Sequence, residues 1–176
     1  MVTILPTADA HVESFHRCLD AVARERRYLA FVEAPPVAAL REFVRAIVAA
    51  GAIQVLALEG DIVVGWCDVL SRPMEGFRHV GALGMGVAAS HRRRGVGEQL
   101  AKAALEQSRA AGLSRVELEV FASNQAAIKL YKKLGFEHEG VKRSARHLDG
   151  AYDDVVLMAV VWEPSRKAAT SIPKKN

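Results

Sequence analysis

Cysteine is scarce in this chain of 176 residues, which contains only Cys18 and Cys67. The two lie far apart and lack paired metal-ligand spacing, so neither a metal site nor a disulfide framework is expected. Long apolar runs are also missing: nowhere do about 18 consecutive apolar residues occur, so no membrane span is expected. The first residues lack the basic and apolar regions of a secretion signal. We therefore expect a cytoplasmic protein with reduced thiols.

Aromatic residues make up only 6% of the chain, and none lies among the basic residues of the segment 163–176. That segment carries +3 of the formal net charge of +4, which leaves only +1 for residues 1–162. A nearly neutral body with a short basic tail is weak evidence for nucleic-acid binding, and the tail has no aromatic side chains on which bases could stack. We predict no nucleic-acid partner.

The length of the chain favours a single domain over residues 1–162, followed by a basic, flexible tail over 163–176. Alternating and periodic apolar residues predict the order β-α-α-β-β-β-α-β-α-β-β. The predicted strands cover 2–5, 53–58, 62–70, 79–88, 115–122, 137–148 and 152–162. The predicted helices open at Pro6 and Thr7, cover 37–50 and 95–111, and follow Ser123 or Asn124. This order predicts an α/β (α+β) fold with a mixed sheet and helices on both faces.

The segment richest in chemical signals runs from a strand through Arg92-Arg93-Arg94-Gly95-Val96-Gly97 into a helix. Glycines at the start of a helix leave backbone N–H groups free to converge on an anion, with the helix dipole behind them. The arginines add charge, and one of them could pair with a phosphate. The segment therefore indicates a pyrophosphate site. Taken alone, it fits a solvated basic turn equally well.

Two other phosphate motifs are not supported. The letters of Gly84-x-Gly86-x-x-Ala89 match a dinucleotide fingerprint, but the predicted helix does not open at those glycines. A mononucleotide P-loop requires Gly-Lys-Ser/Thr, which this chain lacks.

Glu119 and Tyr131 are candidate acid–base residues. Val116, Leu118 and Val120 form one face of the strand at 115–122, and Glu119 lies on the other. Tyr131 follows in the next helix. A carboxylate and a phenol so placed could act as general base and general acid. Either residue alone is more often structural, because a strand glutamate is usually solvated and a helical tyrosine usually packs.

Taken together, these motifs resemble the GCN5-related N-acetyltransferase (GNAT) family. The resemblance rests on Arg92-x-x-Gly95-x-Gly97, then Leu118-Glu119-Val120, then Asn124-x-x-Ala127-x-x-Leu130-Tyr131-x-x-Leu134-Gly135-Phe136. It spans residues 83–136, and the order of strands and helices fits the same fold, with about seven mostly antiparallel strands. The stretch 118–127 is locally most similar to the bacterial ribosomal-protein N-terminal acetyltransferases.

The resemblance implies acetyl-CoA as the cofactor. It places the pantetheine arm beside the strand before the basic turn and the pyrophosphate on the turn. The implied cofactor-binding residues are Met85, Gly86, Val87, Arg92, Arg93, Arg94, Gly95, Val96, Gly97, Glu98, Asn124, Ala127 and Tyr131. It also implies that Tyr131 protonates the departing thiolate, and that Glu119 takes the proton of the amine, directly or through a water.

The acceptor implied by the resemblance is a primary amine that attacks the thioester directly in a ternary complex. A small-molecule amine, an amino acid and a protein N-terminus all stay open. Substrate pockets in the family are lined by the first helix pair and the late hairpin, which here indicate Tyr28, Phe31, Glu33, His79 and residues 143–152. Neither cysteine falls within the motifs, which disfavours an acyl-cysteine route.

A catalytically inactive module that senses acyl-CoA is the alternative function. The presence of both Glu119 and Tyr131 argues against it. The oligomeric state is open, and a homodimer is one option.

Overall fold

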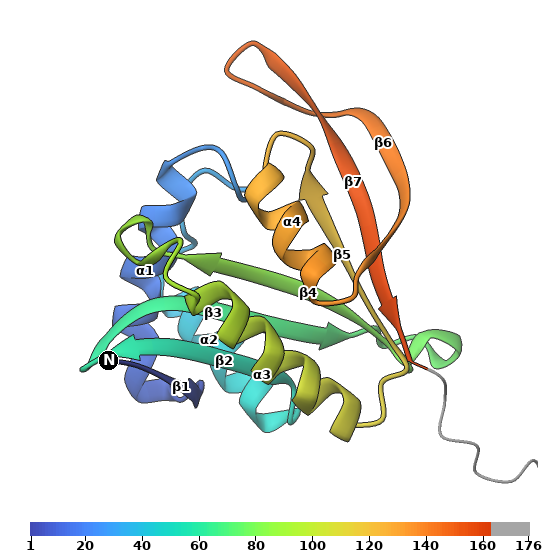
Figure 1. Ribbon diagram of the computed structural model, residues 1–176. Helices are drawn as coiled ribbons and strands as arrows, with labels where there is room; N and C mark the ends of the chain where they lie inside the picture. The colour runs from blue at the N-terminus through green and yellow to red at the C-terminus, as the bar shows by residue number, and fades with distance from the viewer. Residues whose placement is uncertain (163–176) are drawn as a thin grey trace, which may run out of the picture.

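The computed structural model describes residues 1–162, whose strands and helices follow the predicted order (Figure 1). The strands are β1 (Val2–Pro6), β2 (Ile53–Glu59), β3 (Ile62–Ser71), β4 (Val80–Val87), β5 (Arg115–Phe121), β6 (Glu137–Leu148) and β7 (Ala151–Val161). The α-helices are α1 (Val12–Arg24), α2 (Val37–Ala49), α3 (Val96–Ala110) and α4 (Gln125–Lys133). Short 3-10 helices lie at Asp9–His11, Glu75–Phe77 and Ala89–His91. The tail predicted over 163–176 lies outside the described residues.

The strands form one seven-stranded sheet in the order β1-β2-β3-β4-β5-β7-β6. Every neighbouring pair is antiparallel except β4 and β5, which are parallel. Helices α3 and α4 cover one face, called here the α3 face, and α1 and α2 cover the other, called the α1 face (Figure 1). The predicted mixed, mostly antiparallel sheet with helices on both faces is therefore confirmed.

Strand alternation divides the apolar residues between two cores. In β2, Val55 and Ala57 face α3, whereas Leu56 and Leu58 face α1, as the period of two requires. Leu100 of α3 is completely buried on its side of the sheet. Burying a side chain of this size contributes about 1.5–3 kcal/mol, so these two layers fix α3 and α1 firmly against the sheet.

The first helix begins later than predicted. We expected it to open at Pro6 and Thr7, but Pro6 ends β1 opposite Val55, and the Thr7 amide donates to the Gln54 carbonyl at 3.1 Å. The chain therefore stays extended beside β2, and α1 starts only at Val12. Pairing with a distant strand overrode the local helix signal.

Glycines in β4 make room for neighbouring side chains. A Cβ atom on Gly86 would lie 2.2 Å from the Trp66 ring, and one on Gly81 would lie 2.4 Å from Val69. Such close approach is the condition under which a strand accepts glycine, and β4 accordingly stays regular along β3.

Strands β4 and β5 separate after a short paired stretch. Val80–Ala82 pair with Arg115–Glu117, and beyond that point each strand pairs only on its outer side, β4 with β3 and β5 with β7. The two strands diverge visibly in Figure 1. The result is an opening through the middle of the sheet.

An acidic side chain, Asp68, lies partly buried on the α1 face of β3. It pairs in register with Gln54 on one side and Gly84 on the other. Burial raises the pKa of Asp68 to about 7, although a hydrogen bond from Gln54 opposes the shift. Unfolding therefore lets this group ionise at lower pH. The contribution of Asp68 to stability is therefore fully present below the unfolded value of 3.8 and is lost as pH rises to about 7.

Asp68→Asn is expected to remove this dependence on pH. Each unit of pKa shift corresponds to about 1.4 kcal/mol, so the stability of the variant relative to wild type should be about 2–3 kcal/mol higher at pH 8 than at pH 5. Urea unfolding of both proteins at the two pH values measures the difference. Equal relative stability at both values would show that Asp68 titrates normally.

Candidate functional site

A cavity of about 510 Å³ occupies the opening between β4 and β5. Its walls come from both strands, from the turn before α3, from α4 and from the segment that follows α1. The residues that line it are Val22, Tyr28, Leu29, Ala30, Leu83, Gly84, Met85, Gly86, Val87, Arg92, Arg93, Gly95, Gly97, Glu98, Glu119, Val120, Phe121, Asn124, Ala126, Ala127, Leu130, Tyr131 and Val155. Residues from both faces of the sheet therefore share one space.

The turn before α3 has the geometry of an anion site. Arg93 and Gly95 have φ angles of +61° and +82°, and α3 begins directly afterwards at Val96. Left-handed residues in a turn bring successive N–H groups together, and the first N–H groups of a helix have no intrahelical partner. Both features favour an anion at this end of the cavity.

Gly97 keeps the wall beside this turn open. A Cβ atom there would lie 3.3 Å from Met85 Cε and 3.4 Å from Leu130 Cδ2. A side chain at this position would therefore crowd the part of the cavity wall that Met85 and Leu130 form.

Arg92 holds the turn in place rather than reaching freely into the cavity. Its guanidinium donates to both carboxylate oxygens of Glu25, at 2.7 and 2.5 Å, and its Nε donates to the Val87 carbonyl at 2.9 Å. It also lies 4.5 Å from the centre of the Tyr28 ring. These contacts tie the end of α1 to β4. Arg94 and Val96 do not line the cavity, since Arg94 is exposed and Val96 is buried in the core.

The backbone of β4 presents alternate residues to the opening. The Ala88 amide donates to the Val64 carbonyl of β3, and the Val80 carbonyl accepts from the Arg72 amide. The even-numbered residues of β4 therefore direct their backbone N–H and C=O groups towards β3. In an antiparallel pair the residues between them point their N–H and C=O groups the other way. The polar groups of Met85 and Val87 therefore face the opening.

Asn124 begins α4 at the cavity wall. Its side-chain oxygen accepts from the Ala127 amide at 3.2 Å, which caps the helix as predicted. With its oxygen engaged, the side-chain NH₂ group keeps two hydrogens to donate.

Tyr131 lines the cavity from the α3 face. Its ring is 7% exposed and packs against Phe136 with 5.6 Å between ring centres. Burial raises the pKa of the phenol well above its ordinary value. The hydroxyl therefore keeps its proton at neutral pH, so it can donate a proton but cannot accept one as a base.

Glu119 lines the same cavity from the α1 face, because Val116, Leu118 and Val120 point to the other side of β5. Its carboxylate pairs with Lys142 of β6. Glu119 and Tyr131 thus approach one space from opposite faces of the sheet.

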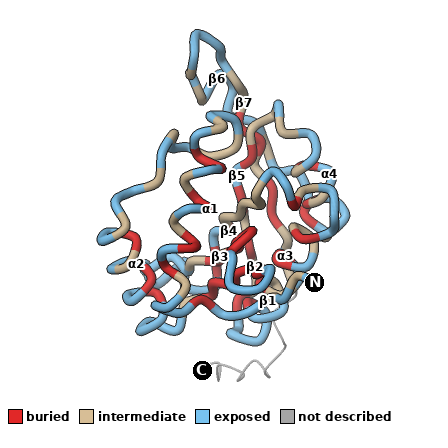
Figure 2. Tube along the Cα trace, turned by 90° about the vertical axis from the view of Figure 1, so that its left-hand side faces the viewer, coloured by how far each residue is buried: buried red, intermediate tan, exposed pale blue. Residues whose placement is uncertain are grey.

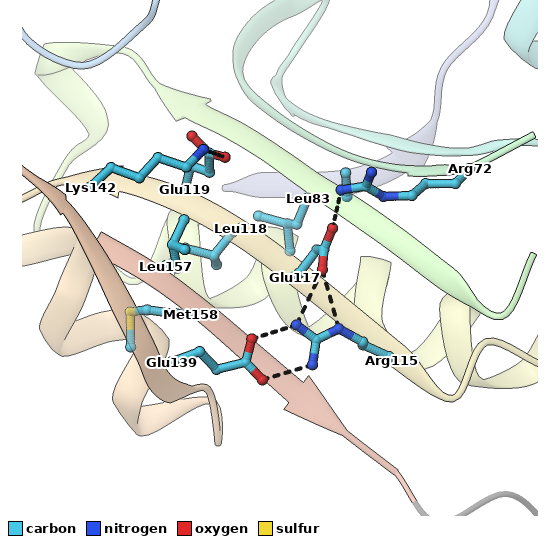
Figure 3. Close-up of a pocket in the computed structure, with 11 residues that line it drawn as sticks. Arg72, Leu83, Arg115, Glu117, Leu118, Glu119, Glu139, Lys142, Leu157 and Met158 are labelled. Carbon is cyan, nitrogen blue, oxygen red and sulfur yellow. Dashed lines mark hydrogen bonds and ion pairs between the residues drawn. The ribbon is translucent and has the colours of Figure 1, made fainter. Parts of the chain in front are cut away.

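A second cavity, of about 530 Å³, adjoins the first (Figure 3). It is lined by Arg72, Ala82, Leu83, Arg115, Glu117, Leu118, Glu119, Glu139, Lys142, Leu157 and Met158. Leu83 and Glu119 line both cavities, so the two spaces meet at the opening between β4 and β5. Its lining combines charged side chains with apolar residues of β4, β5 and β7.

Residues 16–136 match the Acetyltransferase (GNAT) family. The chain belongs to the GNAT family.

Relatives of this GNAT protein include enzymes named for different acceptors. It is 34% identical over 97 residues to an L-methionine sulfoximine/L-methionine sulfone acetyltransferase of Pseudomonas paraeruginosa, covering 55% of this chain and 56% of that protein. It is 37% identical over 109 residues to the L-amino acid N-acetyltransferase AaaT of Escherichia coli, covering 61% of this chain and 66% of that protein. The [ribosomal protein bS18]-alanine N-acetyltransferase of Salmonella typhimurium is 35% identical over 68 residues, covering 39% and 46%. The chain thus spans less than two thirds of each of these relatives.

Solved structures share the fold. A GNAT superfamily phosphinothricin acetyltransferase of Sinorhizobium meliloti, in complex with AcCoA, superimposes with a TM-score of 0.88 at 19% identity, covering 96% of this chain and 93% of that one. A GNAT acetyltransferase of Streptococcus pneumoniae gives a TM-score of 0.86 at 23% identity, covering 93% and 100%. The predicted GNAT fold is confirmed.

Of the substrate residues predicted for this GNAT protein, Tyr28 lines the first of these two cavities, and the others line neither. Phe31 is 43% exposed, and Glu33 lies 3.7 Å from Arg24 on the surface. The His79 carbonyl accepts from the amides of Ser114 and Arg115, which places His79 at the closed end of the opening. Residues 143–152 lie in the β6–β7 hairpin, whose exposed tip projects from the body in Figure 2.

Sequence reasoning missed most of the second cavity. Glu117 shares the strand face of Glu119, so alternation could have identified it. Glu139 gave no such signal: the pairing of β6 with β7 shifts between His138 and Gly140, and this bulge inserts Glu139, which contacts Arg115.

Neither cysteine lines either cavity, and both are buried. Burial raises the pKa of Cys18 to about 11, which keeps that thiol protonated and a poor nucleophile. Within residues 1–162, no cluster of side chains could hold a metal ion, and no helix has the length and apolarity to cross a bilayer.

Proposed function

We propose that this GNAT protein is an acetyl-CoA-dependent N-acetyltransferase that acts on a primary amine by direct attack in a ternary complex. The observation that carries the proposal is the opening between β4 and β5. It joins the turn before α3 on one side of the sheet to a cavity lined by charged side chains on the other. Such an opening lets a long anionic cofactor present its acyl group to an acceptor on the opposite face.

The residues of the cavity fit this cofactor. Backbone amides from Arg93 to Glu98 would hold the pyrophosphate, with the helix dipole of α3 and the exposed Arg93 and Arg94 adding positive charge. The polar backbone groups of Met85 and Val87 and the Asn124 amide would hold the pantetheine arm. Arg92 would act by positioning the turn through Glu25.

Acetyl-CoA supplies a thioester whose carbonyl carbon the amine attacks, with cleavage of the C–S bond. The amine must first lose a proton, because its pKa is near 10.4 for a lysine-like group and near 8 for an α-amino group. Glu119 would accept that proton, directly or through a water. Tyr131 would donate its proton to the thiolate sulfur, and the second proton that the nitrogen loses as the amide forms would restore the phenol. An N–H group of β4 would stabilise the charge on the carbonyl oxygen.

Several broader features belong to the same proposal. They are a single acetyltransferase domain over residues 1–162, a cytoplasmic location, the absence of a nucleic-acid partner, and either a monomer or a homodimer. The relatives named for amino acids, methionine derivatives and a ribosomal protein make these the acceptors to test first.

Incubation with acetyl-CoA and a panel of amino acids, polyamines and peptide N-termini tests the proposal. At least one acceptor should release CoA thiol and gain one acetyl group, detected by mass spectrometry, in a one-to-one ratio. Binding of CoA without release above background hydrolysis for any acceptor would instead support the inactive sensor module.

A further inference from the structure

The charged groups of the second cavity bear on the chemistry of the acceptor. We propose that the acceptor is an amine with a carboxylate next to the reacting nitrogen, as in an α-amino acid, and that Lys142 recognises the carboxylate. This inference rests on the proposed function, because it assumes that the amine reacts beside Glu119.

The Glu119–Lys142 ion pair lies at the meeting point of the two cavities. Lys142 Nζ donates to Glu119 Oε1 across β7, which separates β5 from β6. Both side chains are about half exposed, at 57% for Glu119 and 50% for Lys142. An exposed pair of this kind is held weakly, so an incoming ligand can displace either partner.

The other charged groups of the cavity are already engaged with one another. Arg115 contacts both Glu117 and Glu139, and Arg72 contacts Glu117, as the dashed lines in Figure 3 show. Arg115 is three-quarters covered, so this network is held more firmly than the pair beside the opening. Lys142 is the basic group of this cavity that pairs with Glu119 itself, so it is the one that loses its partner when an amine binds Glu119.

A zwitterion matches this pair in charge. When a substrate ammonium binds Glu119, Lys142 loses its partner, and a carboxylate on the same molecule replaces it. One weak ion pair is thus exchanged for two. An amine without a carboxylate leaves the lysine unpaired, which costs affinity. Leu157, a partly exposed residue of β7 that lines this cavity, offers an apolar surface to the substrate side chain.

The same exchange favours release of the product. After Glu119 takes the amine proton and the N–C bond forms, the nitrogen belongs to a neutral amide. Once Glu119 has passed its proton to solvent, its carboxylate has no cationic partner in the product. The Glu119–Lys142 pair can then re-form.

Kinetics of matched acceptors test the proposal. L-methionine, L-leucine and L-phenylalanine would each be compared with the corresponding amide and with the amine that lacks the carboxyl group. Wild type should favour the amino acids in kcat/KM by about 2–5-fold, the effect expected of one ion pair to a half-exposed lysine. Lys142→Met should remove most of this preference by raising KM for the amino acids, and Lys142→Arg should retain it.

Lys102→Met provides the matched control. Lys102 is an exposed lysine of α3 in an ion pair with Glu98 and does not line the second cavity, so its loss should leave the preference unchanged. Equal use of amino acids and their amides by wild type would overturn the carboxylate proposal and leave the acetyltransferase function intact. So would an equal effect of Lys142→Met on both classes. Absence of CoA release with every acceptor would overturn the proposed function itself.

Discussion

Tyr131→Phe is expected to lower the single-turnover rate of acetyl transfer by about 10²–10⁴-fold, with little change in the affinity for CoA. The substitution removes only the hydroxyl, so the buried ring still packs against Phe136. Because burial raises the pKa of the phenol, wild-type Tyr131 stays protonated through neutral pH. The loss in rate should therefore be similar from pH 6 to 9.

Rapid-quench measurement of one turnover, with acetyl-CoA bound before the amine is added, isolates this effect from slow product release. The melting temperature and the CoA affinity of the variant serve as controls for packing. A Tyr131→Phe variant that kept the full single-turnover rate across this range would exclude the phenol as the acid. A water, or the proton of the amine itself, would then have to protonate the thiolate.

Gly97→Glu is expected to abolish CoA binding. The added side chain must enter the space beside the turn, because Met85 and Leu130 already crowd the Cβ position at 3.3 and 3.4 Å. Its negative charge would then lie where the pyrophosphate is proposed to bind. The fold should survive, since glutamate is a good helix former and is favourable in the first turn of a helix.

Gly97→Gln separates bulk from charge, because glutamine has the same shape without the negative charge. Thermal shift in the presence of CoA should show partial loss for Gly97→Gln and complete loss for Gly97→Glu. If Gly97→Glu bound CoA as tightly as wild type, the pyrophosphate site would have to lie elsewhere.

Local patterns in the sequence were sufficient for the order of elements. Alternation of Val116, Leu118 and Val120 placed Glu119 on the opposite face of β5, and the capping preference of asparagine placed Asn124 at the start of α4. Local signals failed where a distant strand competed, as at Pro6, which continues β1 instead of opening a helix.

Contacts between distant residues explain what the sequence did not reveal in the site. Arg92 was predicted as a cofactor-binding residue and lines the first cavity, but its pairing with Glu25, which is 67 residues away in the chain, could not be predicted from local sequence. The second cavity depends on a bulge at Glu139 and on the end of β3 at Arg72, which no local periodicity encodes. The prediction of Phe31, Glu33 and His79 rested on the family's general layout, and none of them lines either of the two cavities described above.

Titration of the wild-type protein with CoA, followed by thermal unfolding, tests the central claim most directly. A ligand that binds only the folded state should raise the melting temperature progressively, and the added stability reaches about 2.7 kcal/mol at 100 times Kd. Pantetheine, which lacks the pyrophosphate, should give a much smaller shift at equal concentration. An unchanged melting temperature at millimolar CoA would contradict the assignment of the opening between β4 and β5 as the cofactor site.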